Sequence, residues 1–182
     1  DAVVEKAAGN PYFVEEIIRS LIDEGAVRRS SGKFSLARPV EEIVIPDTIS
    51  EILLNRVDRL EPKTHALLQT ASVVGQHFPR RVLAAVAGPV DDLDDRLGQL
   101  EHAQILVRRA HPDEVQYQFK HAIAQETVYK AILHRQRTDL HLRIAEVLEQ
   151  MFASRLHDVF GMLAYHYSAG EHLDKAYEYL TK

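Results

Sequence analysis

The stretch from residue 61 to residue 133 constrains the fold most, because its helical and strand-like patterns follow one another in a restrictive order. Apolar residues at helical spacing predict three helices. They cover Glu61–Ser72, Arg80–Ala87 and Asp91–His102. Two strand-like runs come next, Ile105–Arg109 and Val115–Phe119, with a proline and an aspartate in the turn between them. Three helices followed by a β-hairpin is the order of a winged-helix domain, and we predict that Phe78 supplies a short strand that pairs with the wing.

The residues before this block, 1–60, predict a helical segment with a small hairpin. Gly9 and Asn10 end a first helical pattern, and Pro11 is suited to the first turn of the next helix, where its missing N–H is not needed. Gly25 is a suitable residue to end that helix. A hairpin is predicted over 26–36, and an extended connector over 38–46 leads to the next helix. Either Asp47 or Thr48 is suited to cap that helix, and Glu51 is placed to complete a capping box with Thr48.

The residues after the block, 134–182, predict a long helix and then a helical pair. The long helix covers Arg135–Phe152, and the pair covers Leu156–Ser168 and Leu173–Leu180, with Gly170 in the turn. The expected fold class is therefore mainly α. It consists of a helical segment over 1–60, a winged-helix domain with a small β-hairpin wing over 61–133, and a linker helix with a helical hairpin over 134–182.

Composition excludes several classes of site. The 182 residues contain no cysteine, so disulfides and thiolate metal sites are ruled out, in keeping with a reducing cytoplasm. No apolar run approaches the roughly 20 residues of a membrane span. His134 and His141 are seven residues apart and His166 and His172 are six apart, which is unlike the tighter pairs of zinc sites. We therefore predict no metal site, no membrane partner and a cytoplasmic protein.

Nucleic-acid binding by this chain is disfavoured. The net charge is −5, whereas a dedicated nucleic-acid module normally carries a basic excess. The helix that would enter the major groove begins with four carboxylates, Asp91, Asp92, Asp94 and Asp95, which would repel phosphates and are opposed locally only by Arg96. The basic pairs at 28–29 and 108–109 are interpreted as solvated hairpin faces, with a phosphate or partner contact as the alternative. We expect the winged-helix block to pack against protein.

The sequence holds no complete active site. It contains no GxxxxGK[ST] loop, no Ser/His/Asp arrangement and no HExxH spacing, and its eight glycines are scattered. The chain also starts inside a helical pattern and stops at the end of one, without a tail. We therefore expect a non-catalytic part of a larger protein.

Four segments in order resemble one protein family: GNPYFVEEIIRSLIDEGAV, VEEIVIPDTISEILLNRVDRL, LLQTASVVGQHF and YQFKHAIAQETVYKAIL. Together they resemble the region that follows the nucleotide-binding core in the signal-transduction ATPases with numerous domains, a P-loop group that includes multidomain adenylate/guanylate cyclases and LuxR-type regulators. The resemblance implies the end of an ATPase lid bundle, a winged-helix domain and a first tetratricopeptide-like helix pair. It also implies ATP or ADP as a ligand of the parent protein, with none held tightly by this chain alone.

The resemblance implies two nucleotide contacts. In these ATPases a Gly-x-Pro element begins a lid helix and its proline packs on adenine, and Gly9, Asn10 and Pro11 match that element. A histidine of the winged-helix domain senses the β-phosphate of ADP, and His121 occupies the matching place after the second wing strand, although the acidic residue found next in plant-type relatives is replaced by Ala122. The residues themselves allow simpler roles: a plain helix start at Pro11, and a His121 that caps its helix or packs against Tyr129.

The implied function is regulatory. The region would couple the nucleotide state of an N-terminal core to C-terminal repeats and an effector such as a nucleotide cyclase, with the other domains of the parent and repeat-binding proteins as partners. Two alternatives stay open. One is part of a LuxR-type transcriptional regulator, and the other is a helical protein-interaction module without a nucleotide role.

Overall fold

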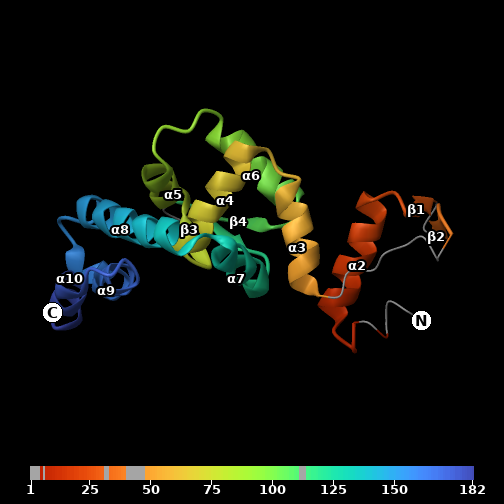
Figure 1. Cartoon of the computed structure of the whole chain (residues 1–182). Coiled ribbons are helices and arrows are strands. Elements are labelled where there is room, and N and C mark those ends of the chain that lie inside the picture. Colours follow the sequence, from red (N-terminus) through yellow and green to blue (C-terminus); the bar gives the residue numbers. More distant parts are fainter. Residues whose placement is uncertain (1–4, 6, 31–32, 40–47, 111–113) are drawn as a thin grey trace. The chain divides into compact units, whose positions relative to one another are not determined.

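The chain is mainly helical, with two small antiparallel sheets (Figure 1). The computed structural model describes residues 5, 7–30, 33–39, 48–110 and 114–182. The chain divides into two compact units, Asp1–Arg59 and Leu60–Lys182, and each unit is described by itself. The expected fold class, mainly α with a small β-hairpin wing, is confirmed.

Among its described residues, the N-terminal unit has the helices α2 and α3 and a hairpin. Helix α2 (Pro11–Asp23) starts as predicted, with Pro11 in its first turn and the Asn10 side chain accepting hydrogen bonds from the backbone N–H groups of Tyr12 and Phe13. It ends at Gly25, whose φ of +69° is a left-handed conformation that glycine adopts without strain. Strands β1 (Val27–Ser30) and β2 (Lys33–Leu36) form the predicted hairpin. The predicted connector falls largely on residues 40–47, outside the described residues.

Helix α3 (Ile49–Asp58) completes this unit, and the Thr48 hydroxyl caps it by accepting from Glu51 N–H at 3.1 Å. The helices α2 and α3 bury a small apolar core. Its members are Ala7, Phe13, Ile17, Leu21, Ala26 and Ile52. Each is 7% exposed or less, as expected for the apolar stripe of an amphipathic helix.

The C-terminal unit begins with the helices and strands of the winged-helix block. The helices are α4 (Pro62–Val74), α5 (Arg80–Ala87) and α6 (Leu93–His102), and the strands are β3 (His77–Pro79), β4 (Leu106–Ala110) and β5 (Val115–Phe119). Strand β3 pairs with β5, with Phe78 opposite Tyr117, and β5 pairs with β4. The predicted pairing of Phe78 with the wing is confirmed. The predicted turn residues 111–113 lie outside the described part of the chain.

The acidic start of α6 is partly neutralised by a residue of the preceding helix. Arg96 is close to these carboxylates in the sequence, but it is Arg80 of α5 that binds Asp94, through two hydrogen bonds of 2.8 and 2.9 Å. Arg96 is buried and donates to Glu61 and Thr64 of α4 instead. Helix α6 also begins two residues later than predicted, since Asp92 has a left-handed φ of +60° and stands outside the helix.

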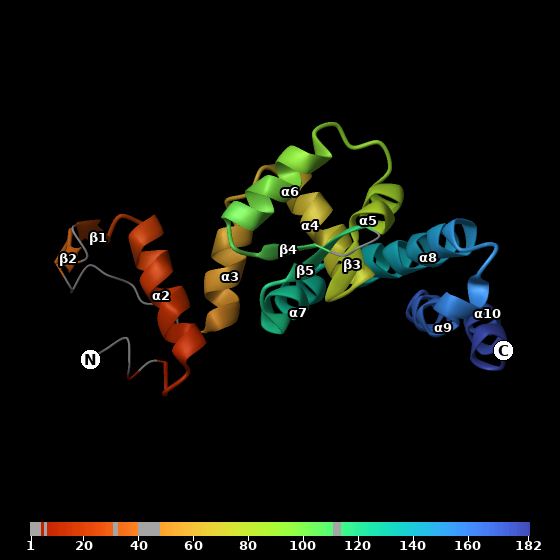
Figure 2. The same ribbon diagram turned by 180° about the vertical axis from the view of Figure 1, so that it is seen from behind.

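The remaining helices follow the wing. They are α7 (Ala122–Ala131), α8 (His134–Met151), the short 3-10 turn η2 (Leu156–Val159), α9 (Phe160–Ala169) and α10 (Leu173–Leu180). Helix α8 packs against α4 and α5 and also against α9, so it joins the helices around the wing to the terminal pair (Figure 2). None of the helices among the described residues combines the length and apolar composition that a membrane span requires.

Gly170 lies in the turn between α9 and α10, as predicted, and it also has a packing role. The residue with the left-handed backbone is Glu171, at φ +62°, whereas Gly170 is buried. A Cβ atom on Gly170 would lie 2.6 Å from Leu142 Cδ2 of α8. Gly170 therefore permits the close approach of α9 to α8.

Candidate functional site

The predicted adenine-contact element lies at the exposed N-terminus of α2. Gly9 has a left-handed φ of +80°, Asn10 caps the helix, and Pro11 is exposed. A helix start alone explains this local geometry, because each residue adopts the conformation that its position in the cap requires. The exposed ring of Pro11 is nevertheless accessible to a planar ligand, so the adenine contact stays a prediction.

A buried ion pair lies one turn further along α2. Glu16 is only 1% exposed and binds Arg56 of α3, with Arg19 Nη1 3.8 Å away. Burial, and next the negative charge of Glu16, raise the pKa of the Tyr12 hydroxyl well above its ordinary value. The helix that presents Pro11 is thereby fixed to α3 by a charged contact as well as by the apolar core.

The predicted phosphate sensor, His121, lies at the junction of β5 and α7. It takes the N-cap position, with φ −137° and ψ 138°, but its side chain makes no capping hydrogen bond. The capping alternative is therefore wrong for the imidazole. Tyr129, the other predicted contact of His121, has its hydroxyl 3.0 Å from His141 Nε2. His121 and the residues 9–11 belong to different compact units, and the phosphate role stays a prediction.

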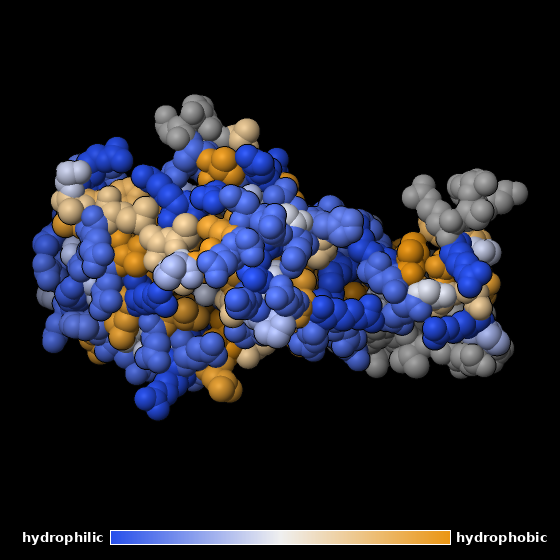
Figure 3. Space-filling view, turned by 90° about the horizontal axis from the view of Figure 1, so that it is seen from above, coloured by the Kyte–Doolittle hydropathy of each residue, from blue (hydrophilic) through white to orange (hydrophobic). Residues whose placement is uncertain are grey.

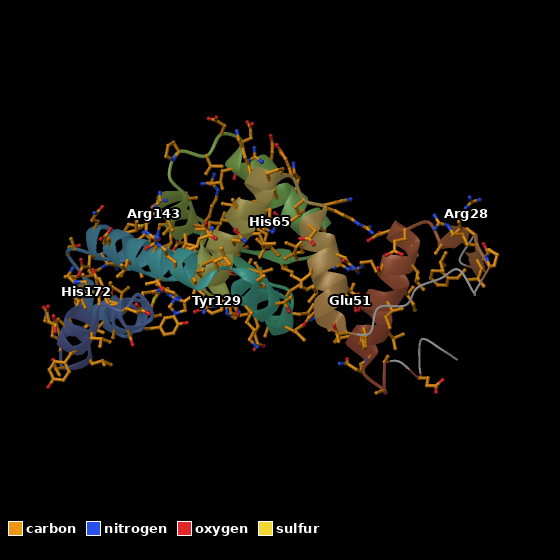
Figure 4. All side chains as sticks on the ribbon, viewed as in Figure 1. Arg28, Glu51, His65, Tyr129, Arg143 and His172 are labelled. Carbon is orange, nitrogen blue, oxygen red and sulfur yellow. The ribbon has the colours of Figure 1, made fainter. Side chains whose placement is uncertain are left out.

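A pair of buried histidines joins α8 to α9, and the sequence did not single it out as a site. His141 and His166 are 1% and 2% exposed, and their Nδ1 atoms are 2.9 Å apart. Together with Tyr129 they form a hydrogen-bonded row that runs from α7 through α8 to α9, which we call the histidine row (residues 129, 141 and 166; Tyr129 is labelled in Figure 4). The Tyr165 ring packs edge-on against the His141 ring, with their centroids 5.5 Å apart.

The histidine row is complete with both rings neutral. One Nδ1 carries a hydrogen and donates it in a hydrogen bond, and the other Nδ1 accepts that bond. The tautomer of His141 also sets its Nε2 atom, which accepts from the Tyr129 hydroxyl if it is bare and donates to it if it is protonated. Burial lowers the pKa of His141 to about 4, helped by the nearby charge of Arg137. Burial lowers the pKa of His166 to about 3, helped by His141. At neutral pH the row is therefore uncharged.

A second, partly buried network holds α10 to α8 and α9. We call it the Glu149 cluster (Glu149, Tyr167, Lys175 and Tyr179). Lys175 Nζ donates to Glu149 at 2.9 Å and to the Tyr167 hydroxyl at 2.8 Å. The Tyr179 hydroxyl also donates to Glu149. Burial alone would raise the pKa of Glu149, but the hydrogen bonds from Tyr179, Lys175 and Tyr167 outweigh it and hold that pKa below its ordinary value.

The sequence carried one signal for the histidine row. His141 stands three, four and seven residues before Ile144, Ala145 and Leu148, all of them buried, so it belongs to the apolar stripe of α8. A histidine in such a stripe needs an internal partner. The identity of that partner, 25 residues away, was not readable from the pattern. Among the residues that the structure describes, no group of three metal-binding side chains lies close enough together to hold a metal ion.

No protein-family model matches the sequence. An uncharacterized protein of Rhizobium meliloti (strain 1021) is 26% identical over 155 residues. The aligned region covers 82% of this chain and 14% of that protein, so the chain is similar to one segment of a much longer protein.

Proposed function

We propose that this chain is a regulatory region of a multidomain ATPase. It couples the nucleotide state of an N-terminal P-loop core to C-terminal helical repeats and to an effector such as an adenylate or guanylate cyclase. ATP or ADP is a ligand of the whole protein, and Gly9, Asn10, Pro11 and His121 are the contacts that this chain contributes. The sequence resemblance supports this proposal, and the much greater length of the similar protein agrees with it.

The histidine row is the observation that supports the coupling role best. It connects α7, which directly follows the proposed phosphate sensor, to α8 and to the terminal helical pair. A displacement of α7 or α9 relative to α8 would leave a buried hydroxyl or imidazole without its partner, which destabilises a protein by about 1–3 kcal/mol per group. Movement at one end is therefore communicated to the other rather than absorbed locally.

The test is calorimetric titration of ADP into the full-length protein. We expect Pro11→Ala to weaken ADP binding roughly 5- to 10-fold through lost apolar contact, and His121→Ala to weaken it about 10- to 100-fold through a lost charged hydrogen bond. Pro62→Ala is the matched control for Pro11, because it is also an exposed proline at a helix start. His134→Ala is the control for His121, because it removes a histidine at another helix start, although His134 is exposed and His121 is partly buried. If the two site variants bind ADP as their controls do, the nucleotide contacts are wrong.

A second candidate function, a helical protein-interaction module, is favoured by the outer face of α10. Leu173, Tyr177 and Leu180 are 68%, 71% and 72% exposed, and their spacing puts them on one stripe. An apolar stripe of this kind is suited to a further packed helix. A full-length protein that binds no ADP, yet loses a helical partner on Tyr177→Ser substitution, would favour this function over the ATPase proposal.

A further inference from the structure

A cavity of about 280 Å³ lies in the C-terminal unit, between α4, the segment that joins α5 to α6, and α8. Its apolar wall includes Leu67, Ala87 and Val90. Its polar lining includes the side chains of Lys63, Asp91 and Arg143. The volume is at the lower end of the range for small-molecule sites, so the cavity suits a compact ligand.

Arg143 lines this cavity and forms no ion pair there with a described residue. Arg80, Arg81 and Arg96 of the same unit each pair with an acidic side chain. Arg143, in contrast, makes no ion pair or hydrogen bond with any residue that the structure describes, although the chain has 27 acidic residues against 22 lysines and arginines. Figure 4 labels Arg143 on α8, near α5. Arg143 is exposed, so its guanidinium group has five N–H donors available to a ligand.

Arg143 lies close to Gly88. A Cβ atom on residue 88 would lie 3.1 Å from Arg143 Nη2, and Gly88 has a left-handed φ of +78°. The glycine therefore allows the guanidinium group to lie directly against the α5–α6 segment. Lys63, on the first turn of α4, lines the same cavity from a second element and likewise has no ion partner among the described residues.

The two cations and the apolar wall together define the ligand. With Asp91 included, the charged lining carries one net positive charge, which favours an anion. Inorganic anions are strongly hydrated and gain nothing from Leu67, Ala87 or Val90, whereas an organic anion buries its apolar part there. In Figure 3, which views the molecule from above, apolar residues show in patches among hydrophilic ones.

We propose that this cavity binds a small organic anion. Its carboxylate or phosphate group lies between Lys63 and Arg143, and its compact apolar body packs against Leu67, Ala87 and Val90. Such a ligand bridges α4, the α5–α6 segment and α8 and so stabilises their packing. The assignment does not depend on the nucleotide role proposed above.

The experiment is an amide NMR titration of the 182-residue chain with benzoate, phenyl phosphate, benzamide and inorganic phosphate. We expect benzoate or phenyl phosphate to shift the amide signals of Gly88 and Thr70 saturably, with a dissociation constant of about 1 mM or tighter. Benzamide, which has the shape of benzoate without its charge, and inorganic phosphate, which has no apolar part, should each bind at least about tenfold more weakly.

Variants locate the site. Arg143→Gln and Lys63→Gln should each weaken binding about tenfold or more, because each removes a charged hydrogen bond. Arg135→Gln is the matched control, since it removes an exposed arginine of the same helix that does not line the cavity. Ala66→Phe should block binding without changing charge, because Ala66 also lines the cavity.

Three results would overturn the proposal. The first is the absence of saturable shifts with every probe up to roughly 10 mM. The second is an equal loss of affinity in Arg135→Gln and Arg143→Gln, which would indicate general charge attraction. The third is equal affinity for inorganic phosphate and phenyl phosphate, which would exclude the apolar contact.

Discussion

Both compact units bury a polar pair between helices, but the pairs are of opposite kinds. In the N-terminal unit Glu16 of α2 and Arg56 of α3 are a charged pair. In the C-terminal unit His141 of α8 and His166 of α9 are a neutral pair whose pKa values are lowered by burial. Removing one partner of the charged pair leaves a buried charge without compensation. The neutral pair is instead sensitive to acid, because protonation would place a charge in a buried site. The two helix contacts should therefore fail under different conditions.

The largest expected effect is on the charged pair. Arg56→Met leaves the Glu16 carboxylate buried without its main countercharge, which should destabilise the α2–α3 contact by about 3–5 kcal/mol. Because the chain has two units, the measurement is native-state hydrogen exchange of the α2 amides rather than a single unfolding curve. The double variant Glu16→Met/Arg56→Met should recover much of the loss. If the double variant is as unstable as the single one, packing rather than charge is responsible.

The next effect is the response of the histidine row to acid. An unfolded histidine has a pKa of about 6.5, whereas the pKa is about 4 for native His141 and about 3 for native His166. The native state therefore binds fewer protons than the unfolded state. The stability that the pair contributes is fully present above about pH 6.5 and falls as the pH is lowered toward the native pKa values. The expected slope is about 1.4 kcal/mol per pH unit for each histidine.

Urea denaturation of the chain across this pH range measures that slope, with helical circular dichroism as the signal. The double variant His141→Phe/His166→Leu should have a shallower acid dependence, because its apolar side chains do not titrate. His134→Gln removes an exposed histidine and should leave the slope unchanged. A double variant with the slope of the unmodified chain would show that the pair is protonated in the native state.

A smaller effect is expected from substituting Gly170, because a larger side chain there would push α9 away from α8 and separate the two histidines. Gly170→Ala places a methyl group against Leu142 and near the backbone oxygen of His166. We expect the free energy of unfolding to fall by about 1–2 kcal/mol. The pKa of His166 should rise as water enters, and NMR titration measures it. Gly161→Ala is the matched control on α9, because a Cβ there meets nothing within 4 Å. That control should be neutral or stabilising by up to about 1 kcal/mol.

The smallest effect is expected from the exposed ion pair of Arg80 and Asp94. Arg80 holds the pKa of the Asp94 carboxyl below its ordinary value through their hydrogen bonds. Solvent nevertheless screens the pair. Asp94→Asn should leave the urea midpoint unchanged within error, as should Asp95→Asn. A measurable fall of the urea midpoint in Asp94→Asn alone would mean that this exposed ion pair stabilises the chain as a buried pair does.

The sequence by itself determined the features that depend on neighbouring residues. Pro11 starts α2, a cap at residue 47 or 48 precedes α3 and Phe78 supplies β3, because caps and short strands are set by local backbone chemistry and side-chain alternation. The structure selects Thr48 as that cap. The order of the helices and of the wing strands follows from hydrophobic periodicity in the same way. The nucleotide roles of Pro11 and His121 rest on resemblance and stay predictions.

Only the tertiary structure decided the contacts between distant residues. Glu16 meets Arg56 across 40 residues and His141 meets His166 across 25. Gly170 is required by Leu142 rather than by its own turn, and Arg80 rather than Arg96 neutralises Asp94. The physical reason is that a periodic pattern shows which face of a helix is buried, but not which residue of another helix will lie against it.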